Sequence, residues 1–89
     1  MSKEFTVLYF ASARDATNVQ SEKISLPPQS TSISLENLTI LLKRRHEKLA
    51  PILENSLYAI NMEYVENDDQ TILVKEGDEV AVIPPVSGG

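Results

Sequence analysis

The end of the sequence, Pro84-Pro85-Val86-Ser87-Gly88-Gly89, holds the feature best suited to chemistry. Glycine has no Cβ, so a diglycine end fits a channel too narrow for side chains and leaves a terminal carboxyl open to attack. The two prolines keep the preceding chain extended and would project the glycines away from a folded domain. An α-carboxylate has a pKa of about 3.5, is ionised at neutral pH and is a poor acyl donor. These residues predict a carboxyl group on Gly89 that another enzyme activates, with ATP-dependent adenylation as the obvious chemistry; the alternative is two glycines there by chance.

Other catalytic groups are scarce. The chain has no cysteine and a single histidine, His46, so it offers no thiolate nucleophile, no cysteine-ligated zinc and no nitrogen–sulfur metal site. We expect His46 to be a structural or capping residue. The acidic run 66–70 lacks the glycine and the closing glutamate of a calcium-binding loop. The sequence therefore predicts no metal site, no permanently bound cofactor and no self-sufficient enzyme, because so small a domain has little volume for an enclosed active site.

The charge balance indicates which partners to expect. The 89 residues carry 8 Lys+Arg against 13 Asp+Glu, a net charge of −5, whereas nucleic-acid binders are usually basic. The basic cluster at 43–48 falls near the end of a predicted helix, where cations complement the helix dipole. We expect no nucleic-acid partner. The acidic residues between 63 and 79 either form a docking surface for a basic partner or lie in charged turns.

Cellular location follows from what the sequence lacks. No apolar run approaches the roughly 20 residues of a membrane helix, and Glu4 interrupts the start of any signal peptide. A small domain without cysteine is more typical of a reducing compartment. We expect a cytosolic protein with no membrane partner.

Apolar periodicity predicts the elements that would carry the tail. Alternating or continuous apolar segments predict strands at residues 3–10, 19–26, 57–61, 63–65 and 80–83. Pro27-Pro28 follow the second of these, which favours an edge strand. Residues 11–18 suit a helical turn or a loop, 29–32 a polar linker, and 71–74 are ambiguous.

One long helix is predicted from Leu35 to Leu49. Ser34 is a suitable N-cap, Pro51 is expected to end the helix, and a short turn begins at 52–53. The stripe that would face the core consists of Leu35, Leu38, Leu42 and Leu49. This order of elements predicts an α+β fold, a β-grasp with a mixed sheet of four to five strands and one main helix. A ferredoxin-like fold fits less well because it needs two long helices. The expected division is a domain at 1–83 and an extended tail at 84–89.

One face of this sheet would remain without a helix. The first and last strands are apolar on both sides, so an apolar patch should remain opposite the helix if they are central neighbours. The patch is either a partner interface or is covered by residues 11–18 and 71–75.

The sequence resembles a known family in several segments. Residues 77–89, Gly-Asp-Glu-Val-Ala-Val-Ile-Pro-Pro-Val-Ser-Gly-Gly, resemble the end of the small, sulfur-carrier subunit of molybdopterin synthase. The resemblance continues at 7–14, 45–49 and 58–65, and Glu47-Lys48 departs from the Pro-Glu that members often carry. It implies a ubiquitin-like β-grasp protein that carries sulfur as a C-terminal thiocarboxylate.

The resemblance also implies partners and residue roles. A ubiquitin-activating-type enzyme would adenylate Gly89 with ATP, used only transiently, and a sulfur donor would convert the adenylate to a thiocarboxylate. The tail would enter the active site of the large subunit, which binds cyclic pyranopterin monophosphate, within a heterotetramer of two small and two large subunits. The inserted residues would be Pro84, Pro85, Val86, Ser87 and Gly88, and the interface residues Phe10, Arg14 and Ile83. Alternatives are a sulfur carrier for tRNA or thiamine thiolation, a ubiquitin-like protein modifier, or an interaction module without tail chemistry.

Overall fold

The computed structural model describes residues 3–65 and 69–85. Within them the chain forms seven strands, β1 (Glu4–Tyr9), β2 (Ser21–Ser25), β3 (Ser32–Ser34), β4 (Leu57–Ile60), β5 (Glu63–Tyr64), β6 (Leu73–Lys75) and β7 (Glu79–Ile83). The helices are α1 (Ala11–Thr17), α2 (Leu35–Arg45), the 3-10 turn η1 (Glu47–Leu49) and α3 (Ala50–Leu53).

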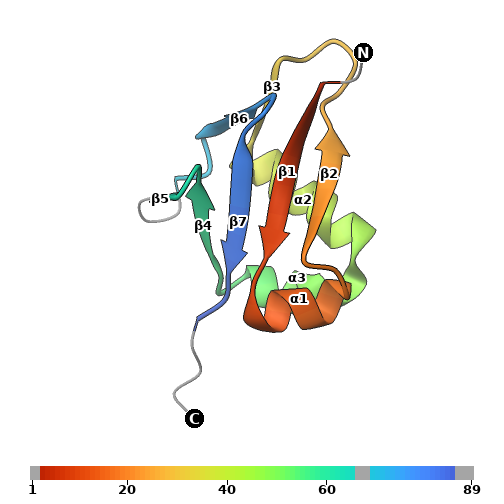
Figure 1. Ribbon diagram of the computed structural model, residues 1–89, viewed down its shortest axis with the longest axis vertical. Coiled ribbons are helices and arrows are strands. Elements are labelled where there is room, and N and C mark those ends of the chain that lie inside the picture. The colour runs from red at the N-terminus through yellow and green to blue at the C-terminus, as the bar shows by residue number, and fades with distance from the viewer. Residues whose placement is uncertain (1–2, 66–68, 86–89) are drawn as a thin grey trace.

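A five-stranded mixed sheet forms the centre of the fold, in the order β2-β1-β7-β4-β5. The neighbouring inner strands β1 and β7 are parallel, and the other pairs are antiparallel. Figure 1 shows β1 and β7 side by side, with α2 behind the sheet and α1 at the end where both strands finish. The predicted mixed sheet with central first and last strands is confirmed, and so is the edge position of β2.

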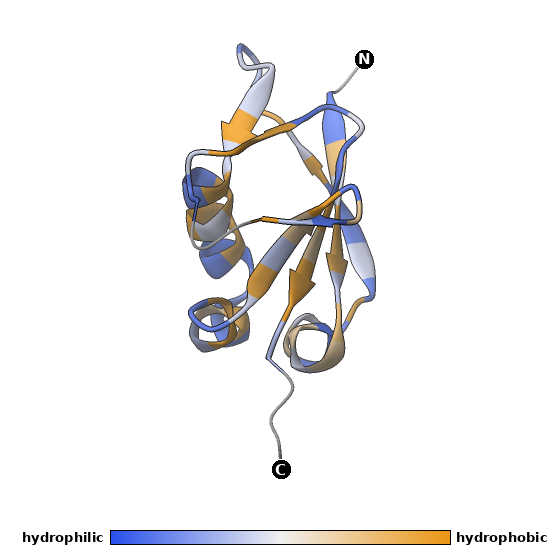
Figure 2. Cartoon of the chain, turned by 90° about the vertical axis from the view of Figure 1, so that its left-hand side faces the viewer, coloured by the Kyte–Doolittle hydropathy of each residue, from blue (hydrophilic) through white to orange (hydrophobic). Residues whose placement is uncertain are grey.

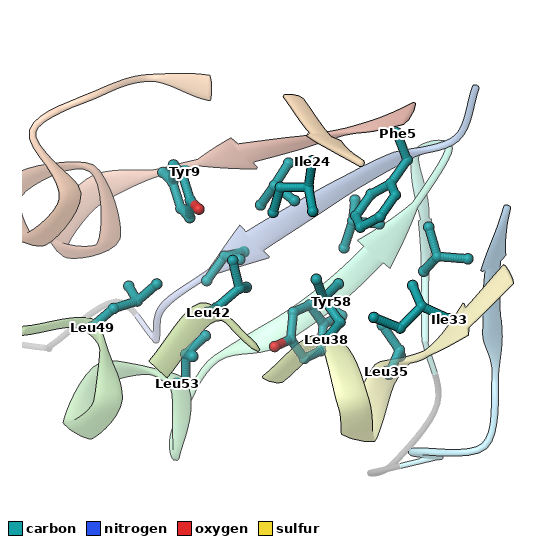
Figure 3. Packing of buried hydrophobic residues seen from close by; sticks show 14 of the residues in the cluster. Phe5, Tyr9, Ile24, Ile33, Leu35, Leu38, Leu42, Leu49, Leu53 and Tyr58 are labelled. Atoms are coloured by element: carbon teal, nitrogen blue, oxygen red, sulfur yellow. The ribbon is translucent and has the colours of Figure 1, made fainter. Parts of the chain in front are cut away.

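The helix α2 packs its apolar stripe on one face of this sheet. The Ser34 hydroxyl accepts a hydrogen bond from the Asn37 N–H at 3.2 Å, as expected of an N-cap. Figure 3 shows the leucines of α2 facing the strands. The largest fully buried side chains are Phe5, Leu35, Leu38, Leu42, Leu49, Val7, Val74, Val80 and Val82. The core therefore lies between α2 and the inner face of the sheet.

The predicted end of the long helix was wrong. It ends at Arg45, because His46 adopts an extended backbone conformation (φ −135°, ψ 95°), and Leu49 reaches the core from the turn η1 instead. Pro51 does not end α2 but lies in the first turn of α3, where its missing N–H leaves no bond unmade.

A second, two-stranded sheet pairs β3 with β6. Its first strand falls partly on residues expected to be a polar linker, and its second on the ambiguous segment. Ile33 and Val74 face each other across this pair and are both buried. The small sheet therefore closes the core beside the start of α2.

Candidate functional site

The outer face of the sheet carries an open apolar hollow of about 310 Å³. Phe10 is 46% exposed and Tyr64 67% exposed, although both are large apolar residues. Figure 2 shows apolar residues along the central strands, with α2 to one side of them. We call this surface the apolar patch; it comprises Leu8, Phe10, Ala59, Met62, Tyr64, Ala81 and Ile83, with Glu79 at its edge.

Parallel pairing brings two distant parts of the chain together in the patch. Tyr9 is level with Val82, and the Phe10 N–H donates to the Val82 carbonyl at 3.3 Å. The ends of β1 and β7 therefore place Phe10 and Ile83 on the same hollow. Both residues were predicted to lie on the uncovered face, and the structure confirms that position; their contact with a partner stays a prediction.

The segments expected as possible covers do not line this hollow. The helix α1 sits at the end of the sheet, and β6 pairs with β3 (Figure 1). The turn into α1 is abrupt: Ala11 has a φ of 49°, and the Phe10 carbonyl accepts the Ala13 N–H at 3.0 Å. This turn carries the chain away at Phe10, so residues 11–18 do not cover the patch.

Arg14 lies next to the patch on α1. It is exposed, and it lines a neighbouring hollow of about 300 Å³ together with Phe10 and Leu8. The ion pairs found in the described part of the chain both involve Glu22, so Arg14 is not paired with Asp15 there. The predicted contact of Arg14 with a partner stays a prediction.

The predicted tail leaves the domain beside the patch. Pro84 and Pro85 directly follow β7, the first buried and the second exposed. The remaining predicted tail residues, Val86, Ser87, Gly88 and Gly89, lie outside the described residues, and their roles stay predictions. The strand that ends at Ile83 therefore connects the patch directly to the prolines.

A polar cluster missed by the sequence analysis joins β1, β2 and the end of α2. The Glu22 Oε1 atom accepts from the Tyr9 hydroxyl at 2.5 Å and lies 3.0 Å from His46 Nε2 and 3.6 Å from Arg45 Nε. The His46 ring also meets Tyr9 edge-on, with centroids 5.9 Å apart. These contacts give His46 the structural place expected for it. The sequence carried one signal of this cluster: Glu22 is a charged residue at an inward-facing position of β2, opposite the buried Val7.

The ionisation of this cluster follows from its contacts. Burial by itself would raise the pKa of Glu22, but the hydrogen bonds from Tyr9 and His46 and the charges of His46 and Arg45 together lower it. Burial, followed by the bond to Glu22 and its charge, raises the pKa of Tyr9 above its usual range. The cluster therefore holds an ionised carboxylate and a neutral phenol, which suits it to fixing the end of α2.

Comparison with known proteins identifies the family. The family model described as the ThiS family matches residues 7–89. The chain belongs to the ThiS family. A molybdopterin synthase sulfur carrier subunit from Homo sapiens is 42% identical over 83 residues, which cover 93% of this chain and 91% of that protein.

Solved structures of molybdopterin-converting factor subunits share the fold of this ThiS-family chain. The putative molybdopterin converting factor subunit 1 from Pyrococcus furiosus has a TM-score of 0.77 and 31% identity, covering 96% of this chain and 100% of that one. A Helicobacter pylori structure, a complex of subunits 1 and 2 of molybdopterin-converting factor, matches with a TM-score of 0.65 and 23% identity over 97% of this chain and 99% of that one.

These comparisons bear out two of the sequence-based predictions. They confirm the resemblance to molybdopterin synthase sulfur carriers and the ubiquitin-like β-grasp fold.

Among residues 3–65 and 69–85, no helix is both long and apolar enough to cross a membrane.

Proposed function

We propose that this chain is the sulfur carrier of molybdopterin synthase and that the carboxyl of Gly89 carries the sulfur. The observation that supports this most is the diglycine at 88–89, which follows two prolines and a strand bordering the apolar patch. A 42% identical human relative bears the name of a sulfur carrier subunit. A carrier needs an unhindered acyl end and a surface for docking, and these residues supply both.

The proposed loading has two steps. A ubiquitin-activating-type enzyme uses ATP to convert the Gly89 carboxylate to an acyl adenylate, with release of pyrophosphate. A hydrosulfide equivalent then attacks the acyl carbon and displaces AMP, so that sulfur replaces one carboxylate oxygen. ATP is consumed transiently, and the carrier keeps no cofactor. A glycine at this position favours both steps, because no side chain hinders the attack of the carboxylate on the α-phosphate of ATP or the attack of the hydrosulfide on the acyl carbon.

Delivery takes place inside the large subunit. The tail, Pro84 to Gly88, enters a narrow channel while the apolar patch, with Phe10, Ile83 and the adjacent Arg14, docks on the surface around it. The thiocarboxylate sulfur attacks a carbon of cyclic pyranopterin monophosphate and displaces an oxygen substituent, which joins carrier and substrate through a thioester. Water then hydrolyses that thioester, which leaves the sulfur on the substrate and returns Gly89 to its carboxylate. Two such transfers build the dithiolene of molybdopterin. The assembly that we propose is a heterotetramer of two small and two large subunits in the cytosol. The chain donates sulfur but is not an enzyme by itself.

A precursor-conversion assay tests the proposal. The carrier is incubated with its cognate activating enzyme, ATP and sulfide, then mixed with the large subunit and cyclic pyranopterin monophosphate. We expect molybdopterin with the full chain and none with a chain that ends at Gly88. Conversion by the shortened chain would contradict the proposal. Gly89-dependent covalent adducts on cellular proteins, without conversion, would instead indicate a protein modifier.

A further inference from the structure

The turn between β4 and β5 has an unusual residue at its second central position. Ile60 pairs with Glu63, so Asn61 and Met62 form a two-residue hairpin turn. Both have positive φ, 51° for Asn61 and 72° for Met62. Turns of this kind favour Asn-Gly, because the second position suits a residue without Cβ. Asn61 meets this preference, and Met62 does not.

Hydrogen bonds to Asp78 and to Glu79, the first residue of β7, hold the hairpin turn at Asn61. The Asn61 N–H donates to the Glu79 carbonyl at 2.8 Å, and the Glu79 N–H donates to the Asn61 side-chain oxygen at 3.0 Å. The Asn61 amide also donates to Asp78 Oδ1 at 3.0 Å. These bonds hold Asn61 in place, and the Ile60–Glu63 pairing leaves Met62 as the second central residue of the turn, in the left-handed region.

Packing of the Met62 side chain within the fold does not compensate for this strain. Its side chain is 92% exposed, the highest value among the large exposed apolar residues of the described chain. A left-handed residue with a Cβ is strained, whereas glycine is not. An apolar side chain that is both strained and in water is typical of a residue kept for contact with a partner.

The position of Met62 identifies the surface that it extends. Met62 lines the same hollow as Phe10 and Ile83. It does so from the side opposite Phe10, because Phe10 follows β1, whereas Met62 lies between β4 and β5, on the other side of β7. Glu79 lines the hollow and Glu63 follows Met62 directly; both are exposed. A partner that covers this corner must therefore offer an apolar recess with a basic rim.

We propose that Met62 is a second anchor of the apolar patch, which the large subunit buries in an apolar recess bordered by basic side chains. This inference rests on the proposed function, since it assigns a contact residue to the same docking surface. The flexible thioether adapts to a recess of irregular shape, and the rigid turn fixes where the side chain projects. The strain at Met62 in the free chain is then a cost that docking offsets.

Two variants separate the strain from the contact. Met62→Gly removes both, so we expect the Tm of the free chain to rise by about 4 °C while the Kd for the large subunit weakens about tenfold. Met62→Gln keeps the Cβ and the length but not the apolar surface, so the Kd should weaken with the Tm unchanged. The control is Ile40→Ala, because Ile40 is an apolar residue on α2 that is also exposed (47%) but lies outside the patch.

Thermal melts and calorimetric titration with the large subunit of the same organism measure these effects. A rise in Tm with weaker binding for Met62→Gly, and weaker binding alone for Met62→Gln, supports the proposal. Unchanged Kd values in both variants, beside tight binding by the wild type, would overturn it and leave the proposed function standing. A lower Tm for Met62→Gly would overturn the argument from strain. Absence of binding by the wild type would overturn the proposed function as well.

Discussion

Replacement of Phe10 by alanine should weaken binding of the large subunit by a factor that the structure allows us to estimate. Phe10 is 46% exposed, so about 90 Å² of a phenylalanine surface of roughly 200 Å² remains open. Covering that area at about 25 cal/mol per Å² contributes about 2 kcal/mol, which corresponds to roughly thirtyfold in Kd.

A matched control separates this binding effect from a loss of folding stability. Ile40 is 47% exposed on α2, so Ile40→Ala removes a side chain that is buried to a similar fraction. Both variants should lower the Tm of the free chain, but only Phe10→Ala should weaken the complex. Calorimetric titration at a temperature well below both melting transitions measures the Kd, and thermal melts measure the folding cost.

The reasoning would be refuted by either of two results. An unchanged Kd for Phe10→Ala in a folded chain would show that the apolar patch is not the docking surface. Equal weakening of binding by Phe10→Ala and Ile40→Ala would show that the loss reflects general destabilisation.

Three further predictions concern the elements that support the site. Glu22→Gln should reduce the loss of stability in acid. The pKa of Glu22 is lower in the folded chain than its unfolded value of about 4.3, so the carboxylate adds stability above that pH, and this stability is lost as the pH falls through the folded pKa. The same decrease of Tm with falling pH in wild type and variant would contradict this prediction. Ser34→Ala should cost about 1 kcal/mol in denaturant unfolding by removing the acceptor for the Asn37 N–H, and Ser34→Asp should restore it; no difference between alanine and aspartate would argue against the cap. Leu38→Ala should cost about 2–5 kcal/mol in the same assay, since Leu38 is fully buried; a cost below about 1 kcal/mol would place it outside the core.

The sheet was predictable because its central strands carry apolar residues on both sides. Val80 and Val82 face the core while Ala81 and Ile83 face the patch, and a strand with two apolar faces belongs in the middle of a sheet. The end of α2 was not predictable, since His46, where the backbone becomes extended, contacts Glu22 of a strand that is distant in the sequence. The short strand Ser32–Ser34 gave no signal by itself, because only pairing with β6 makes it a strand.

The candidate site was predictable in part for the same reason. Phe10 and Ile83 follow from strand alternation and from parallel pairing of the two strands that carry them. Met62 does not, because nothing in the dipeptide Asn-Met indicates a turn with two positive φ angles. Asn61 is held by hydrogen bonds to Asp78 and Glu79, which lie 17 and 18 residues further along the chain and which local sequence does not reveal.

The most direct test of the account is the intact mass of the chain after loading. The full chain, incubated with its cognate activating enzyme, ATP and sulfide, should gain the mass difference between one sulfur and one oxygen atom, and fragmentation should locate the gain at Gly89. A variant ending at Gly88 and a variant with one residue added after Gly89 should remain unchanged. An unshifted mass for the full chain, or the same shift in the shortened variant, would contradict the claim that the carboxyl of Gly89 carries the sulfur.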